Sequence, residues 1–178
     1  ILKMQRLGME PSLSSDVEVT MTADFFTQMR SAMTMQRMVV NQMILDQGTF
    51  TPPNQWPTPA PGTPPLLNVR DVLRFATING AKHLRLDGKT GSLTPGKEAD
   101  IILLDATALN VAPLNNVPGA VVSLMDRTNV ETVIVAGTVR KWKGKLLGVD
   151  LNHLRRQLEA SRDHVFAAAG IAQNVFGQ

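Results

Sequence analysis

Asp16 is the residue of this sequence whose setting best suits chemistry. It follows Ser14-Ser15 in a short apolar-to-polar run, Pro11 to Val17, which predicts a strand, and it precedes a predicted helix by a few residues. A carboxylate between a strand and the helix that follows it lies where α/β folds assemble their active sites. Taken alone, a Ser-Ser-Asp run more often makes a turn or a helix cap, so the catalytic interpretation depends on this position.

Other residues that could bind a metal or act as nucleophiles are scarce. His83, His153 and His164 are far apart, and the last two share a predicted helix without the i, i+4 spacing that brings two ligands to one metal. The chain has no cysteine and no tyrosine, which excludes disulfides, thiolate catalysis, cysteine-bound zinc and phenol acids. We therefore expect no histidine-based metal site within this chain.

The run from Gly91 to Glu98 nearly matches a phosphate-binding loop but departs from it three times. Glu98 takes the place of the residue that would hold magnesium, Pro95 removes an N–H group, and the run leads into a predicted strand rather than a helix. The sequence therefore favours a Pro-Gly turn that opens a strand.

Charge and hydropathy limit the classes of partner. Lys and Arg number 18 and Asp and Glu 15, a net charge of +3 that forms no basic stripe, so we expect no nucleic acid partner. No apolar run reaches the roughly 20 residues that span a bilayer, and no signal peptide is evident, so we expect no membrane partner. The lack of cysteine fits a reducing, cytoplasmic location. The start at Ile1, within a helical pattern, suggests that the chain begins inside a larger protein.

The elements that must position Asp16 are a helix, a loop and a second helix. The first helix should begin with Thr22 as its cap and end at Gly48. Residues 51–65 are proline-rich and should form an extended surface loop anchored by Trp56. Asn68 should cap a second helix that ends near Asn79-Gly80. Apolar residues at helical spacing should form the buried face of the first helix: Phe26, Met29, Met33, Val40 and Ile44.

The second half of the chain predicts strands and a final helix. The apolar run 101–104 is typical of a strand covered on both faces, and Val121-Val122 suggests another strand. Residues 130–142 predict a hairpin around Ala136-Gly137, and residues 143–145 a turn into a last short strand. From Asp150, an amphipathic helix should follow.

Several runs resemble the amidohydrolase superfamily, in its branch of cytosine-deaminase-like, metal-dependent hydrolases. They are Ser14-Ser15-Asp16, residues 21–30 (MTADFFTQMR), 76–82 (ATINGAK), 91–105 (GSLTPGKEADIILLD) and 130–137 (VETVIVAG).

The resemblance implies an α/β fold: the C-terminal part of a TIM-like (β/α)8 barrel plus part of a small β-sandwich. Residues 1–90 would end the barrel, with strand 8, its helix, the proline-rich loop and a covering helix. Residues 91–149 would supply sandwich strands, and residues 150–178 a C-terminal helix. Asp16 then matches the aspartate at the end of barrel strand 8, which in this family binds or approaches the metal and carries protons during catalysis.

The same resemblance implies a divalent metal, zinc or iron, and a small ring substrate that loses ammonia to metal-activated water. The family's His-x-His run and its later histidines are missing here, and a barrel takes roughly 250 residues. We therefore expect the isolated chain to bind no metal tightly, to be inactive, and to associate with itself or with a missing N-terminal half. Two alternatives stay open: a non-catalytic structural or assembly module, and a weak nucleic-acid binder.

Overall fold

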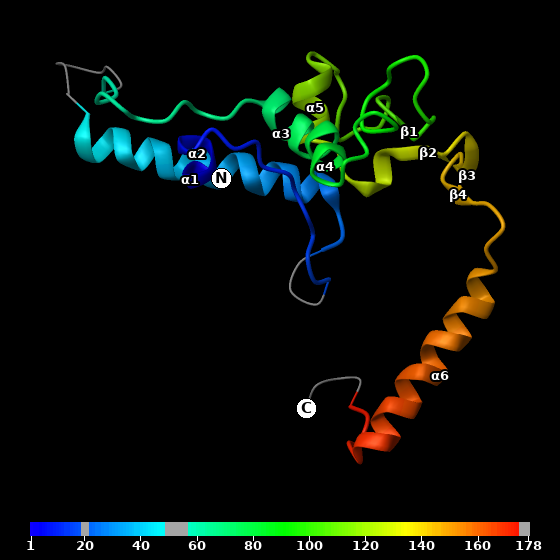
Figure 1. The fold of residues 1–178 in the computed structure, drawn as a ribbon. Coiled ribbons are helices and arrows are strands. Elements are labelled where there is room, and N and C mark those ends of the chain that lie inside the picture. The colour runs from blue at the N-terminus through cyan, green and yellow to red at the C-terminus, as the bar shows by residue number, and fades with distance from the viewer. Residues whose placement is uncertain (19–21, 49–56, 175–178) are drawn as a thin grey trace. The chain divides into compact units, whose positions relative to one another are not determined.

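The structure is a computed structural model that describes residues 1–18, 22–48 and 57–174. The chain divides into two compact units, Ile1–Lys145 and Leu146–Gln178, which Figure 1 shows as a ribbon. The fold is mixed α/β with a four-stranded antiparallel sheet of order β1-β2-β3-β4. The parts of the proline-rich loop at residues 51–56, with the predicted anchor Trp56, lie outside the described residues.

The first unit is built around α2 (Phe25–Gln47), which carries a buried apolar face. The five residues predicted for this face are all buried, which confirms the helical spacing. The helix cap is Asp24, whose side chain accepts the Phe26 N–H at 3.1 Å. The prediction that Thr22 caps the helix was wrong: its hydroxyl oxygen accepts the Asp24 N–H instead.

Shorter helices complete the core of this unit. They are α1 (Leu2–Arg6), α3 (Val69–Phe75), α4 (Ile78–His83) and α5 (Val117–Ser123). In Figure 1, α3 and α5 lie beside the N-terminal half of α2, and α4 follows α3. The buried apolar cluster comes from α2, α3, α5 and the segments between helices, and it contains Phe26, Met29, Met33, Leu67, Val72, Phe75, Val111, Ala120, Val122 and Met125.

Asn68 caps α3 as predicted, and it does so in a capping box with Asp71. The helix predicted to continue to Asn79-Gly80 is instead two helices, because the chain leaves helical geometry at Thr77. The Thr77 hydroxyl donates to the Leu73 carbonyl oxygen at 2.7 Å. Such a bond back to the preceding turn is a known cause of bending.

The sheet contains β1 (Ile101–Leu104), β2 (Val130–Val135), β3 (Thr138–Trp142) and β4 (Lys145–Leu146). A short 3-10 helix, Arg127–Asn129, leads into β2. The predicted hairpin is confirmed: β2 and β3 pair in antiparallel fashion around Ala136 and Gly137, whose φ angles of 47° and 76° match the turn that tight hairpins prefer.

Three predicted strand features were wrong. Val121 and Val122 lie in α5, because Asn116 caps a helix there through the Gly119 N–H. β1 is not covered on both faces within this unit, since Ile102 is 51% exposed. Pro11 to Val17 forms no strand, and none of the strands of the described residues pairs with it. Without a neighbouring strand, its backbone groups have no ladder to join.

The second unit holds α6 (Leu151–Ala169), which confirms the predicted final helix. Asp150 caps its start by accepting the N–H groups of Asn152 and His153. Gly170 ends it with a left-handed φ of 65°. Among the described residues, none of the helices has the length and apolar character needed to cross a membrane.

Candidate functional site

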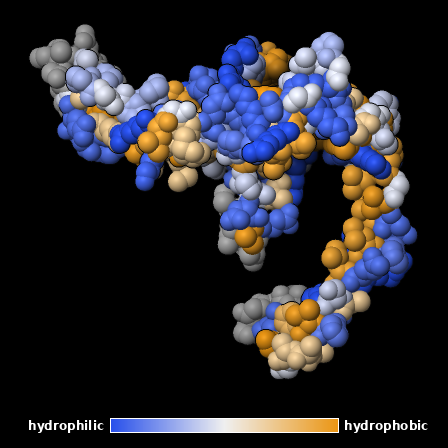
Figure 2. Space-filling view, viewed as in Figure 1, coloured by the Kyte–Doolittle hydropathy of each residue, from blue (hydrophilic) through white to orange (hydrophobic). Residues whose placement is uncertain are grey.

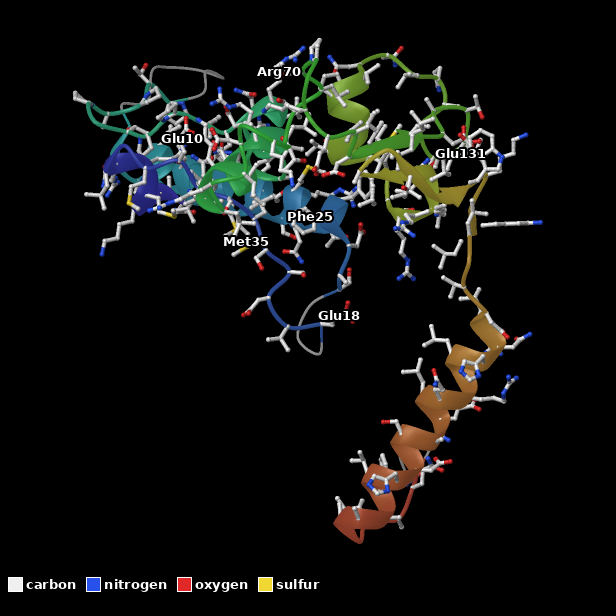
Figure 3. All side chains as sticks on the ribbon, turned by 45° about the vertical axis from the view of Figure 1, so that its right-hand side comes forward. Glu10, Glu18, Phe25, Met35, Arg70 and Glu131 are labelled. Atoms are coloured by element: carbon white, nitrogen blue, oxygen red, sulfur yellow. The ribbon has the colours of Figure 1, made fainter. Side chains whose placement is uncertain are left out.

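Asp16 lies exposed on the segment between α1 and α2. Its φ of 54° is left-handed, a conformation that Asp tolerates better than most residues with a side chain. Its backbone N–H donates to the Ser14 hydroxyl oxygen at 3.0 Å. A second exposed carboxylate, Glu18, lies two residues further along the same loop (Figure 3). The chain therefore turns at Asp16 and presents it at the surface of this unit.

The segment that leads to Asp16 is held by an ion-pair cluster at Glu10. One Glu10 carboxylate oxygen lies 2.9 Å from Lys82 Nζ and the other 3.3 Å from Arg74 Nη2. The hydrogen bond and the charge of Lys82 are the main causes that hold the pKa of Glu10 below its ordinary value, with smaller contributions from Arg74 and His83. All three partners belong to α3 and α4, so these helices fix the segment by charge.

Two hydrogen bonds to the backbone add to this anchoring. The buried Asn79 donates through Nδ2 to the Pro11 carbonyl oxygen at 2.9 Å. The Leu13 N–H donates to the carbonyl oxygen of Phe75 at 3.3 Å. The segment is thus tied at successive residues to α3 and to the start of α4, only a few residues before Asp16.

The histidines do not gather around Asp16. His83 Nδ1 lies 2.8 Å from the Ser12 hydroxyl, which makes it a further anchor of the same segment. His153 and His164 both lie on α6, in the second unit. Within residues 1–18, 22–48 and 57–174, no three His, Cys, Asp or Glu side chains lie together as a metal site requires. The described residues therefore do not fit a metal ion by themselves, and Asp16 could supply one ligand at most.

Asn79 is a buried polar residue near the candidate site to which the sequence analysis assigned no role. Its side chain is 2% exposed, and its Oδ1 has no hydrogen-bond partner among the described residues. It lines a cavity of about 720 Å³ together with Glu10, Arg74 and the segment 62–68. The signal that could have pointed to Asn79 is its place in the run 76–82, which resembles the family.

The motif at residues 91–100 has a structural role. Gly91 has a left-handed φ of 84°, and a Cβ there would lie 2.6 Å from Ala81 Cβ, so this glycine permits close packing on α4. Lys97 donates through Nζ to the backbone carbonyl oxygens of Thr90, at 3.1 Å, and of Asp87. The lysine that resembled a phosphate ligand therefore closes a turn ahead of β1.

Asp100 joins this turn to the hairpin. Its carboxylate accepts the Ala136 N–H at 2.8 Å and the Thr90 hydroxyl at 2.7 Å. These hydrogen bonds, the one from Ala136 first, hold the pKa of Asp100 below its ordinary value. The carboxylate is thus a structural link between residues 90 and 136.

A comparison with known protein families covers the anchored segment together with β1 and β2. A family model described as "Amidohydrolase family" matches residues 2–140. A 5-methylthioadenosine/S-adenosylhomocysteine deaminase of Acetivibrio thermocellus is 34% identical over 87 residues, which are 49% of this chain and 20% of that protein. A 5′-deoxyadenosine deaminase of Methanosarcina acetivorans is 33% identical over 108 residues, or 61% of this chain and 24% of that protein.

The fold is also similar to a solved structure, an adenosine deaminase from Xanthomonas campestris with bound zinc. The TM-score is 0.76 at 24% sequence identity, over 92% of this chain and 33% of that one. At this identity the likeness shows a shared fold. The chain spans about a fifth to a quarter of the length of the curated relatives named above.

Proposed function

Because this chain belongs to the amidohydrolase family, we propose that it is the C-terminal portion of a metal-dependent amidohydrolase that hydrolytically deaminates a small ring substrate. The family match over residues 2–140 carries this proposal. The relatives are named as deaminases of adenosine-type nucleosides, so such nucleosides are the first substrates to test.

In this proposal, residues 1–90 end a TIM-like barrel, residues 91–149 contribute the strands of a small sandwich, and residues 150–178 form a C-terminal helix. The segment 11–17, which forms no strand in this chain alone, would pair as barrel strand 8 with strands outside this chain. Its present contacts support that arrangement, because Glu10, Pro11 and Leu13 are already fixed to α3 and α4. The anchored segment would then bring Asp16 to the barrel rim.

The proposed role of Asp16 is proton transfer. A carboxylate takes a proton from the attacking water and returns it to the leaving amine, and a positioned group of this kind contributes about 100- to 10,000-fold to the rate. The Ser14 hydrogen bond and the left-handed backbone at Asp16 support this role, because they fix the turn that presents the carboxylate.

The complete protein would hold a divalent metal, zinc or iron, and Asp16 would be one of its ligands or close neighbours. The remaining ligands would come from outside this chain, since its described residues bring no three candidate ligands together. For the same reason we propose that the isolated chain is inactive. The expected cytoplasmic location stays a prediction.

The test is ammonia release from 5′-methylthioadenosine and adenosine by the complete protein carrying Asp16→Ala. We expect a loss of about 100-fold or more in kcat with an unchanged unfolding transition. Glu18→Ala is the matched control, because it removes an exposed carboxylate from the same loop (Figure 3), and it should keep its turnover. Unchanged turnover in Asp16→Ala would instead favour a structural or assembly module.

We also infer that the chain associates, with itself or with the rest of such a hydrolase. Apolar side chains exposed on both units support this inference, among them Ile102 on β1 and Leu158 on α6. Light scattering that shows only monomer at high concentration would contradict it.

A further inference from the structure

One face of α6 is apolar and exposed, and it has no partner among the described residues of the second unit, 146–174. Leu151, Leu154, Leu158 and Val165 are 56%, 43%, 62% and 59% exposed. Their spacing of three, four and seven residues puts them on one side of the helix. Figure 2 shows hydrophobic side chains gathered along α6, beside hydrophilic ones. A stripe of this length on an otherwise polar helix is typical of a helix that pairs with another helix.

The stripe follows a heptad pattern along the whole helix. Leu151, Leu158 and Val165 occupy the a positions, and Leu154 occupies the first d position. The remaining d positions hold the small residues Ser161 and Ala168, which would let two backbones approach closely. The pattern therefore alternates by three and four residues over the 19 residues of α6, about 28 Å of helix.

We propose that α6 pairs with α6 of a second copy of this chain as a parallel, in-register coiled coil. This proposal rests on the inferred self-association and assigns it to one surface. The second copy is favoured because the residues beside the stripe complement themselves in this arrangement. Asp150, the N-cap residue directly before α6, would lie near Arg155 of the second copy, and Gln157, at a g position, would face Arg162 of the second copy.

The antiparallel arrangement lacks this complementarity. In an antiparallel pair that keeps the a and d positions of the two helices in contact, Leu151 packs on Ala168 of the other helix. Arg155 then lies beside Arg162 of the other helix. Like charges at these flanking positions oppose pairing. The closeness of Arg155 and Arg162 therefore disfavours the antiparallel orientation, although Arg162 also pairs with Asp163 on its own helix at 2.8 Å. Because helices of this length are marginal alone, we expect the dimer to depend on protein concentration.

Disulfide trapping tests the orientation directly, since the chain has no cysteine of its own. In the parallel coiled coil, the two Ala168 positions face each other, whereas in the antiparallel one they lie about 25 Å apart along the axis. The 178-residue chain with Ala168→Cys should form a covalent dimer under mild oxidation. Ala160→Cys, an exposed alanine at a c position of the same helix, should form much less.

Light scattering supplies the second readout. The unaltered chain should approach twice its 19.4 kDa mass as concentration rises, and the double change Leu154→Glu with Leu158→Glu should return it to monomer. Equal cross-linking of the two cysteine variants, or none, would overturn the proposal. If the Glu variant stays dimeric, association stands but not through α6. If the unaltered chain is monomeric, the proposal and the inferred self-association both fail.

Discussion

At Gly91, two of the runs that carry the family resemblance come into contact. A Cβ at this position would lie 2.6 Å from Ala81 Cβ and 3.2 Å from Ile78 Cα, and the φ of 84° is left-handed. Only glycine satisfies both conditions, so the motif 91–105 can pack on the motif 76–82. Gly91 therefore permits the packing of these two runs on each other, which is a structural role.

Gly91→Ala should destabilise the first unit by about 2–4 kcal/mol, because strain in the backbone adds to a steric clash. Gly96→Ala is the matched control: its φ of 92° is also left-handed, but no atom lies within 4 Å of the added Cβ. It should cost only about 1–2 kcal/mol. Urea unfolding curves measure both, and equal losses would contradict the packing argument.

The stability that Asp100 contributes should depend on pH. Its folded-state pKa is lowered by hydrogen bonds from Ala136 and Thr90, so the stabilisation is complete above the ordinary value of 3.8 and is lost as the pH falls through the lowered pKa. Asp100→Asn keeps the size but not the charge. It should therefore be less stable than the unaltered chain at pH 6.

Comparing the unaltered chain with Asp100→Asn at low pH tests this prediction. The difference in urea midpoint between the two proteins should shrink as the pH falls below 3.8 and through the lowered pKa of Asp100. A difference that stays constant between pH 6 and pH 2.5 would show that the charge of this carboxylate contributes nothing.

Among the elements, α2 links distant segments through polar side chains as well as through its apolar face. Gln36 is 4% exposed; its Oε1 accepts the Leu67 N–H at 3.0 Å, and its Nε2 donates to the Pro65 carbonyl oxygen at 2.8 Å. Arg37 donates to the Leu67 carbonyl oxygen at 2.7 Å. These bonds fix the end of the proline-rich loop before α3 begins.

Gln36→Ala should lower the free energy of unfolding by about 2–4 kcal/mol, because it leaves the buried Leu67 N–H unpaired and opens a cavity. Gln42→Ala, on the same helix, removes an exposed amide bonded to Asp46 and should change stability by less than about 0.5 kcal/mol. Similar losses in the two variants would argue against a role for Gln36 in holding the loop.

The elements also show why some of the fold was predictable. The apolar spacing of α2 and the Ala136-Gly137 turn are local signals, and both predictions are confirmed. α5 was missed because valines favour strands, whereas here Asn116 caps a helix and Arg30 of α2 donates to the carbonyl oxygens of Val122 and Met125. Contacts between distant segments overrode the local preference.

At the candidate site, too, local features could be predicted from the sequence, whereas contacts between distant segments could not. Asp16 could be singled out from its neighbours in sequence, and the family resemblance is confirmed by the match to residues 2–140. The anchoring of the segment before it depends on pairs such as Glu10 with Lys82 and Pro11 with Asn79. No local pattern announces these pairs, because their members lie some 70 residues apart.

For the whole molecule, we propose that this chain brings one carboxylate, Asp16, to an active site whose other metal ligands lie outside its described residues. The fold agrees with that of a zinc-bound deaminase over 92% of this chain but only 33% of the larger protein. The described residues contain no cluster that could hold a metal. A chain of this kind should depend on a larger assembly for turnover.

The most direct test is ammonia release by the purified 178-residue chain, supplied with zinc and 5′-methylthioadenosine. We predict no release above the rate of the buffer and no zinc retained through gel filtration. Zinc-dependent ammonia release by this chain alone would contradict the proposal that its metal ligands lie outside it.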